Sequence, residues 1–250
     1  MAKRSRLSAF GSRRGRGRRL FKKRRVQKVQ VVKPRAASRI RLYRTLGQPK
    51  RKTVIMPYST NVSLTSVVPG ASQNYVMRAN SIFDPDVTGA GHQPLSHDQW
   101  ALFYNHYVVT YCTVTCEWIN ANAPGTAMYP QAIGIQINDD VNTLITGGAG
   151  ISTALENKHI RYRFVPRTDK AEADSRTWKV KYRFSPLKFA NRSKYSQDVR
   201  AAMGNNPTEQ VMIHVFAAPL SAADTVGTWY VNIHVAYTVE LSEPKELTQS

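Results

Sequence analysis

Basic side chains gather at the amino terminus of this chain, where they could bind a polyanion. The first 52 residues contain 21 of the 36 Lys and Arg and no Asp or Glu. Guanidinium and ammonium groups at this density attract a phosphate backbone without reading base sequence. The candidate nucleic-acid-binding residues of this arm are Arg13, Arg14, Arg16, Arg18, Arg19, Lys22, Lys23, Arg24, Arg25, Lys28, Arg35, Arg39, Arg41 and Arg44.

The rest of the chain is almost neutral. Residues 53–250 carry 15 basic side chains and all 16 acidic ones, which gives this part a formal charge of −1. The arm has few aromatics, so it buries too little apolar surface to offset its conformational entropy, and we expect it to be disordered. The sequence therefore predicts a nucleic-acid-binding arm at 1–52 and a folded domain at 53–250. The basic runs of the arm also fit a nuclear localisation signal that an import receptor recognises.

A second basic pattern lies in two expected strands, residues 159–167 and 177–184. Cationic and apolar side chains alternate in both, so the apolar sets are predicted to face the core and the cations the opposite faces. This could be a folded-surface phosphate patch formed by Arg161, Arg163, Lys179, Lys181 and Arg183. The alternatives are a solvated face, or pairing across a subunit contact with Asp169, Glu172 and Asp174.

Catalytic and metal-binding patterns find little support in the sequence. The 6 histidines show no metal-ligand spacing. Cys112 and Cys116 lie about 13 Å apart on one face of an expected strand, so we predict two buried thiols without a disulfide. The acidic residues of 84–86 and 138–140 are better explained as turn formers than as Ca²⁺ ligands. We predict no catalytic residue, metal or cofactor.

The elements that must position these groups are strands. Eight segments of strand character follow the arm, separated by Pro, Gly, Asn and Asp. They are residues 53–67 (interrupted at Pro57), 73–80, 107–120, 131–138, 159–167, 177–184, 210–218 and 228–241. Short helices are expected only in the connections, with Ser96 and Ser196 as caps. The pattern predicts an all-β, eight-stranded antiparallel jelly-roll sandwich with a disordered basic N-terminal arm.

Neither a membrane span nor a secretory signal is expected. The sequence has no apolar run of about 18 residues, and basic residues continue through the region where the apolar part of a signal would lie. We therefore expect no membrane insertion and a protein used in the cytosol or nucleus.

One stretch carries a family resemblance. It reads Arg-Ala-Asn-Ser-Ile-Phe-Asp-Pro-Asp over residues 78–86, continues through Gly-His-Gln-Pro at 91–94, and reaches Trp100 and Tyr104. It resembles the capsid (coat) proteins of circular Rep-encoding single-stranded DNA viruses, the circovirus-like group, in which an Arg-rich arm precedes a jelly roll. The residues themselves indicate a turn, in which Asn80, Asp84 and His92 form loop-fixing hydrogen bonds and the aromatics cover the end of the sandwich.

The resemblance implies a viral capsid protein. Such a protein self-assembles into a small T=1 icosahedral shell of about 60 copies, packages a single-stranded DNA genome on its arms, and is found in the virion and in the host nucleus during assembly. Two alternatives stay open: a capsid protein of a small RNA virus, and a cellular nucleic-acid-binding protein with a basic tail. The host, the cell-surface receptor and the loops that face outward are not indicated.

Overall fold

The computed structural model describes residues 49–122, 128–142, 145, 147–148, 151–167 and 177–246. All of them belong to the unit that spans Thr45–Ser250. The fourteen predicted arm residues from Arg13 to Arg44 lie outside the described residues, as do Asp169, Glu172 and Asp174. Among the described residues, no helix is long and apolar enough to cross a membrane.

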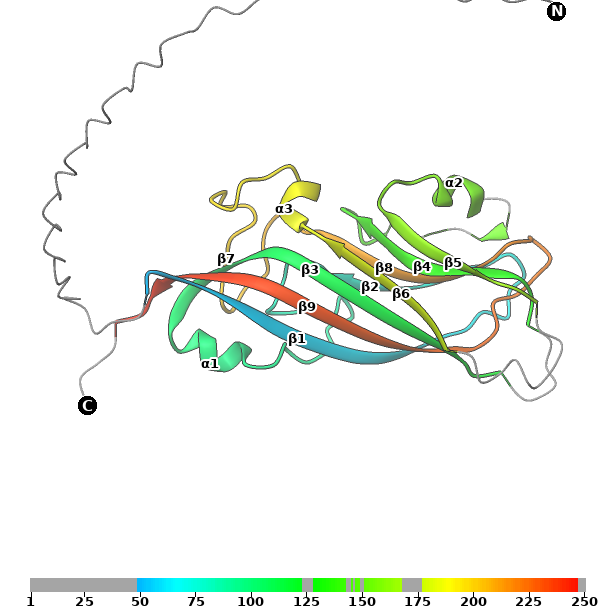
Figure 1. The fold of residues 1–250 in the computed structure, drawn as a ribbon, viewed down its shortest axis with the longest axis horizontal. Helices are drawn as coiled ribbons and strands as arrows, with labels where there is room; N and C mark the ends of the chain where they lie inside the picture. The colour runs from blue at the N-terminus through cyan, green and yellow to red at the C-terminus, as the bar shows by residue number, and fades with distance from the viewer. Residues whose placement is uncertain are drawn as a thin grey trace, which may run out of the picture. The chain divides into compact units, whose positions relative to one another are not determined.

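Two antiparallel sheets form the fold (Figure 1). The first contains β1 (Arg51–Leu64), β9 (Trp229–Pro244), β3 (Tyr104–Asn120) and β6 (Thr177–Phe184) in that order, and the short β7 (Ala201–Ala202) also pairs with β3. The second contains β2 (Gln73–Arg78), β8 (Met212–Pro219), β4 (Gln131–Asn138) and β5 (Ile160–Val165) in that order. Strand β1 begins two residues before the predicted start of the folded domain at Thr53.

The pairing of these strands is that of a jelly roll. Early strands pair with late ones in nested order: β1 with β9, β2 with β8, β3 with β6, and β4 with β5. Together these pairs form one long hairpin of strands. The hairpin is rolled up into two sheets, because β3 also pairs with β9, and β4 also pairs with β8. The rolling places β5 at the edge of one sheet and β6 at the edge of the other. The predicted fold class is confirmed.

The core lies between the sheets and follows the period-2 pattern of the sequence. In β9, alternate residues from Trp229 to Leu241 are buried. Trp229 Nε1 donates a hydrogen bond of 2.9 Å to Gln131 Oε1, which joins β9 of one sheet to β4 of the other. Cys112 and Cys116 are buried free thiols, as predicted, and burial raises the pKa of both.

Pro57 does not interrupt the first strand, contrary to the prediction. Strand β1 continues through it, because β1 is an edge strand paired with β9 alone. The carbonyl oxygen of Pro57 accepts a hydrogen bond from Leu95 N, on the side that no strand occupies. The absent N–H therefore costs no sheet hydrogen bond.

The helices are short and lie in connections: α1 (His97–Ala101), α2 (Ile151–Leu155) and α3 (Pro186–Phe189). Ser96 precedes α1, but it adopts φ 71° and makes no capping hydrogen bond, because a cap requires an extended backbone. The prediction of a helix after Ser196 is wrong, since residues 201–202 form β7 and pair with His106 and Tyr107. Pairing with β3 outweighs the local helix signal there.

Candidate nucleic-acid interface

Cationic side chains meet in a groove between the edge strands β5 and β6. Its lining includes Arg161 and Arg163 from β5 and Lys179 and Lys181 from β6, together with Tyr162 and Val180. The groove has a volume of about 480 Å³. Because the rolled chain brings the edges of the two sheets together, four of the five predicted patch residues share one site although they come from different sheets.

Strand β5 faces the opposite way from the prediction. Arg163 pairs with Ile133, and Arg161 pairs with Ile135, so the arginines share a sheet face with two core residues. Tyr162 and Phe164 point to the other face and are 39% and 52% exposed. An edge strand covers its inner face incompletely, which lets long cations occupy inward positions and still reach water. Alternation alone could not distinguish the two orientations.

Strand β6 follows the prediction. Trp178, Val180, Tyr182 and Phe184 pair with the core-facing residues of β3 and belong to the core or pack against it. The three cations of β6 are exposed on the outer face of its sheet. Arg183 does not line the groove, however, because its guanidinium lies over the ring of Tyr111, with Cζ 5.3 Å from the ring centroid.

The groove cations differ in how far their charge is compensated. Lys179 Nζ lies 2.7 Å from Glu117 Oε1, and this hydrogen bond lowers the pKa of the Glu117 carboxyl. Arg161 donates a hydrogen bond of 2.8 Å to the carbonyl oxygen of Ile160. In the described part of the chain, no carboxylate lies within ion-pair distance of Arg163 or Lys181. These two are the charges most available to an anion.

The first residue of β1, Arg51, contacts the connection between α3 and β7. Arg51 donates a hydrogen bond of 3.2 Å to Tyr195 Oη, and its guanidinium lies over the Tyr195 ring. Lys194 forms an ion pair of 2.8 Å with Glu240, which also lies 3.7 Å from Arg51. The hydrogen bond from Arg51, followed by the charge of Lys194, lowers the pKa of the Tyr195 hydroxyl. No local sequence pattern predicts this contact, because Tyr195 lies 144 residues from Arg51.

The motif that carries the family resemblance forms a hydrogen-bonded loop, as predicted. The Asn80 side chain donates to Glu209 O at 2.7 Å and accepts from Val211 N at 3.0 Å. Asp84 forms an ion pair of 2.7 Å with Arg78. His92 Nε2 lies 3.0 Å from Ser59 O. These contacts fasten the loop to the strands on either side of it.

The aromatics that follow the motif cover this end of the sandwich. Tyr104 is buried, and Trp100 packs against the core. The ring centroid of Trp100 lies 6.4 Å from that of Phe103 and 6.2 Å from that of Tyr104. Phe83 packs nearby, with its ring centroid 6.4 Å from that of His97. The predicted covering role is confirmed for Trp100 and Tyr104, whereas Phe103 stays 40% exposed.

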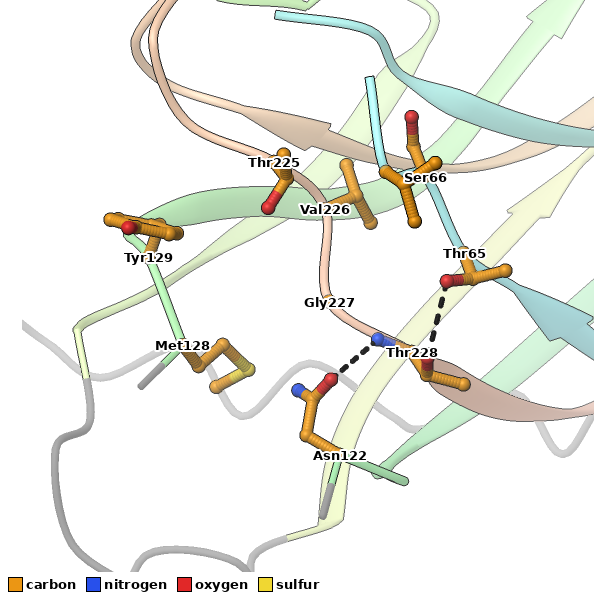
Figure 2. Close-up of a pocket in the computed structure, with 10 residues that line it drawn as sticks. Thr65, Ser66, Asn122, Met128, Tyr129, Thr225, Val226, Gly227 and Thr228 are labelled. Atoms are coloured by element: carbon orange, nitrogen blue, oxygen red, sulfur yellow. Dashed lines mark hydrogen bonds between the residues drawn. The ribbon is translucent and has the colours of Figure 1, made fainter. Parts of the chain in front are cut away.

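A second pocket, of about 270 Å³, lies among the loops that join β1 to β2, β3 to β4 and β8 to β9 (Figure 2). Asn122 Oδ1 accepts a hydrogen bond of 2.8 Å from Thr228 N, and the hydroxyls of Thr65 and Thr228 are 3.1 Å apart. Its lining residues are neutral. Among the described residues, no cluster of three His, Cys, Asp or Glu could hold a metal ion.

Two histidines that alternate with core residues in their strands differ in their surroundings. His234 is exposed on β9, with Nδ1 2.8 Å from Ser59 Oγ. His214 on β8 is fully buried, and its Nε2 donates a hydrogen bond of 2.9 Å to the carbonyl oxygen of Asp140. Burial lowers the pKa of His214. The connection after β4 contacts this sheet face, which period-2 alternation could not indicate.

No protein-family model and no curated protein sequence matches the chain. Several solved virus structures are similar to it. A chain of turnip yellow mosaic virus is 13% identical with a TM-score of 0.38, over 82% of this chain and 88% of that one. A chain of the 60-mer BFDV capsid protein is 8% identical with a TM-score of 0.42, over 80% and 97%.

A chain of the semi-empty virus-like particle of the giant freshwater prawn nodavirus is 12% identical with a TM-score of 0.41, over 88% of this chain and 96% of that one. At these identities and TM-scores, no partner or residue role is transferred from these proteins to this chain.

Proposed function

We propose that this chain is a viral capsid protein, whose jelly roll assembles into a closed shell and whose arm packages a single-stranded genome. The observation that carries the proposal is the partition of charge at the first strand of the fold. Twenty-one basic residues and no acidic one occupy 1–52, whereas residues 53–250, which form all of the jelly roll except the first two residues of β1, carry a formal charge of −1. A nearly neutral body can pack against copies of itself while the arm neutralises phosphates.

Exposed apolar side chains support self-association. Ile55 on β1, Leu95 beside its free edge and Leu102 at the end of α1 are 69%, 70% and 70% exposed. Leu95 N donates a hydrogen bond to Pro57 O, so Ile55 and Leu95 lie near the same edge of the sheet. Apolar side chains gathered on a surface mark contact regions between proteins. We propose that further copies of this chain cover them in the shell.

The arm supports the identity of the cargo. Its Lys and Arg would follow the backbone of a flexible polynucleotide without sequence preference, and no base-reading module is recognisable in the sequence. The motif at residues 78–94 favours the circovirus-like group and therefore single-stranded DNA over RNA. The same basic runs would bind an import receptor before assembly, which would bring the protein to the host nucleus.

Electron microscopy of the purified full chain tests the proposal. We expect uniform closed shells that contain nucleic acid which DNase degrades after the shells are opened. Degradation by RNase alone would assign the protein to an RNA virus. A persistent monomer that binds nucleic acid would instead indicate a cellular protein with a basic tail and would overturn the capsid proposal. Nuclear accumulation of a fluorescent protein fused to residues 1–52 tests the import signal.

A further inference from the structure

We propose that the groove between β5 and β6 is a second nucleic-acid site, which binds a single strand by holding phosphates on Arg163 and Lys181 and stacking a base on Tyr162 and Phe164. This inference rests on the proposed packaging function and extends it from the arm to the folded domain. It commits to single-stranded nucleic acid as the ligand of the groove.

The phosphate-binding part of the proposed site rests on cations whose charge no carboxylate of the described residues compensates. Four cations line the groove, and Glu117 compensates only Lys179. Arg161 is held in place by its hydrogen bond to Ile160 O and its contact with the Tyr182 ring. Arg163 and Lys181 are left exposed on facing edges of the two sheets, where they can reach an anion. A groove of about 480 Å³ is within the size range of sites that hold small organic ligands.

The base-binding part rests on the unexpected orientation of β5, which turns Tyr162 and Phe164 to the sheet face opposite Arg163. The bound strand would therefore cross the edge of β5, with phosphates on one side and a base on the other. Tyr162 lines the groove, and its ring centroid lies 5.2 Å from that of Phe164 with the ring planes at 66°. Both side chains are substantially exposed, although large aromatic side chains normally gain stability by burial. A base offers a flat face of the same kind, and stacking on it would cover this surface.

The pairing of aromatics with cations favours a single strand over a duplex. In a duplex the bases are stacked on one another and cannot lie on a protein ring, whereas a single strand can turn a base outward while its phosphates stay in a cationic groove. The simpler alternative is that these charges only protect two free sheet edges from pairing with other strands. Charge reversal separates the two roles, because a carboxylate still blocks edge pairing but repels a phosphate.

Photocrosslinking of the full chain tests the site. Because each crosslink is mapped to a residue, contacts in the groove are distinguished from contacts with the arm. The probe is an oligodeoxythymidine in which iododeoxyuridine replaces part of the thymidine, and crosslinked residues are mapped by mass spectrometry. We expect crosslinks at Tyr162 and Phe164 as well as within residues 1–52. The Arg163→Glu/Lys181→Glu variant should lower the yield at the two aromatics roughly fivefold or more. Circular dichroism confirms its fold, and Arg163→Gln/Lys181→Gln replaces it if the fold is lost.

Two control variants make comparable substitutions at exposed residues outside the groove. Lys245→Glu reverses an exposed charge outside the groove, and Tyr230→Ala removes an exposed aromatic from β9. Both should leave the yield at Tyr162 and Phe164 unchanged. A duplex of the same length should crosslink far less at these positions.

The outcomes separate this site from the packaging function. Crosslinks confined to residues 1–52 would overturn the groove site and leave packaging by the arm intact. Equal crosslinking of the duplex, or protection of the groove by a sulfated polysaccharide but not by oligodeoxythymidine, would also overturn it. A chain that crosslinks nowhere and forms shells without nucleic acid would overturn the proposed packaging itself.

Discussion

The guanidinium of Arg161 lies over the ring of Tyr182, with Cζ 4.9 Å from the ring centroid. Arg161 belongs to the edge strand of one sheet, and Tyr182 to the edge strand of the other. The contact joins the edge strands of the two sheets, and Arg161 also lines the cationic groove. Its position also explains why Arg161 can face inward with no carboxylate partner among the described residues, since the face of an aromatic ring attracts a cation.

This contact should contribute a measurable coupling energy. In a double-mutant cycle of Arg161→Ala and Tyr182→Leu, we expect a coupling of about 0.5–1 kcal/mol in the free energy of unfolding. Urea denaturation of the two single variants and the double variant measures it. Additive effects of the two substitutions would show that the cation and the ring do not interact.

Asn80 should be structural. Asn80→Ala leaves the buried Val211 N–H and the Glu209 carbonyl without their partner, and each unsatisfied group costs about 1–3 kcal/mol. We expect a lower free energy of unfolding and fewer shells. Chemical denaturation measures the first, and Asn61→Ala on the exposed face of β1 is the matched control. Unchanged stability in Asn80→Ala would contradict the loop-fixing role.

Stability should fall in mild acid because of His214. Burial lowers its pKa in the folded state, whereas the unfolded chain has the ordinary value of about 6.5. The unfolded state therefore binds the proton more readily. The contribution of His214 is complete above pH of about 6.5 and is lost as the pH falls from there through the lowered folded-state pKa.

Unfolding free energies measured between pH of about 7 and 5 test this prediction. His214→Gln should flatten the pH dependence relative to the parent protein. His159→Gln is measured alongside, because burial also lowers the pKa of His159, which acts in the same direction. An unaltered pH dependence in His214→Gln would contradict the assignment.

Binding to a single strand should weaken steeply with salt. If all 21 arm charges met phosphates, the logarithm of the binding constant would fall with the logarithm of salt concentration at a slope of about −15. Replacing Arg13, Arg14, Arg16, Arg18 and Arg19 by Gln should make the slope shallower by about 3–4. Fluorescence anisotropy with oligodeoxythymidine measures both slopes, and equal slopes would show that these five residues meet no phosphate.

The strands and the core were predictable from the sequence, because strict alternation marks a strand with one buried face. The pattern of β9 from Trp229 to Leu241 is an example, and the predicted bounds of β4 and β6 agree with the structure. The nested strand order follows from the fold class. The loop-fixing role of Asn80 was also predictable, since Asn and Asp beside Pro and Gly form turns through side-chain hydrogen bonds.

The orientation of β5 was not predictable, and this changed the candidate site. Alternation in Ile160–Val165 fits either face, and the choice depends on the register with β4, which places Arg163 opposite Ile133. Contacts between distant segments, such as Arg51 with Tyr195, also leave no local pattern. The sequence therefore indicated four of the cations that line the groove, but it could not indicate that Tyr162 and Phe164 lie exposed on β5.

The central claim is that the arm holds the genome and the jelly roll forms the shell. Deleting residues 2–44 tests it most directly, with shells imaged by electron microscopy and their nucleic acid measured by the ratio of absorbance from bases to absorbance from protein. We predict that the truncated chain folds, forms shell contacts and holds little nucleic acid. A truncated chain that packages as much nucleic acid as the full chain, or that fails to fold, would contradict this division of roles.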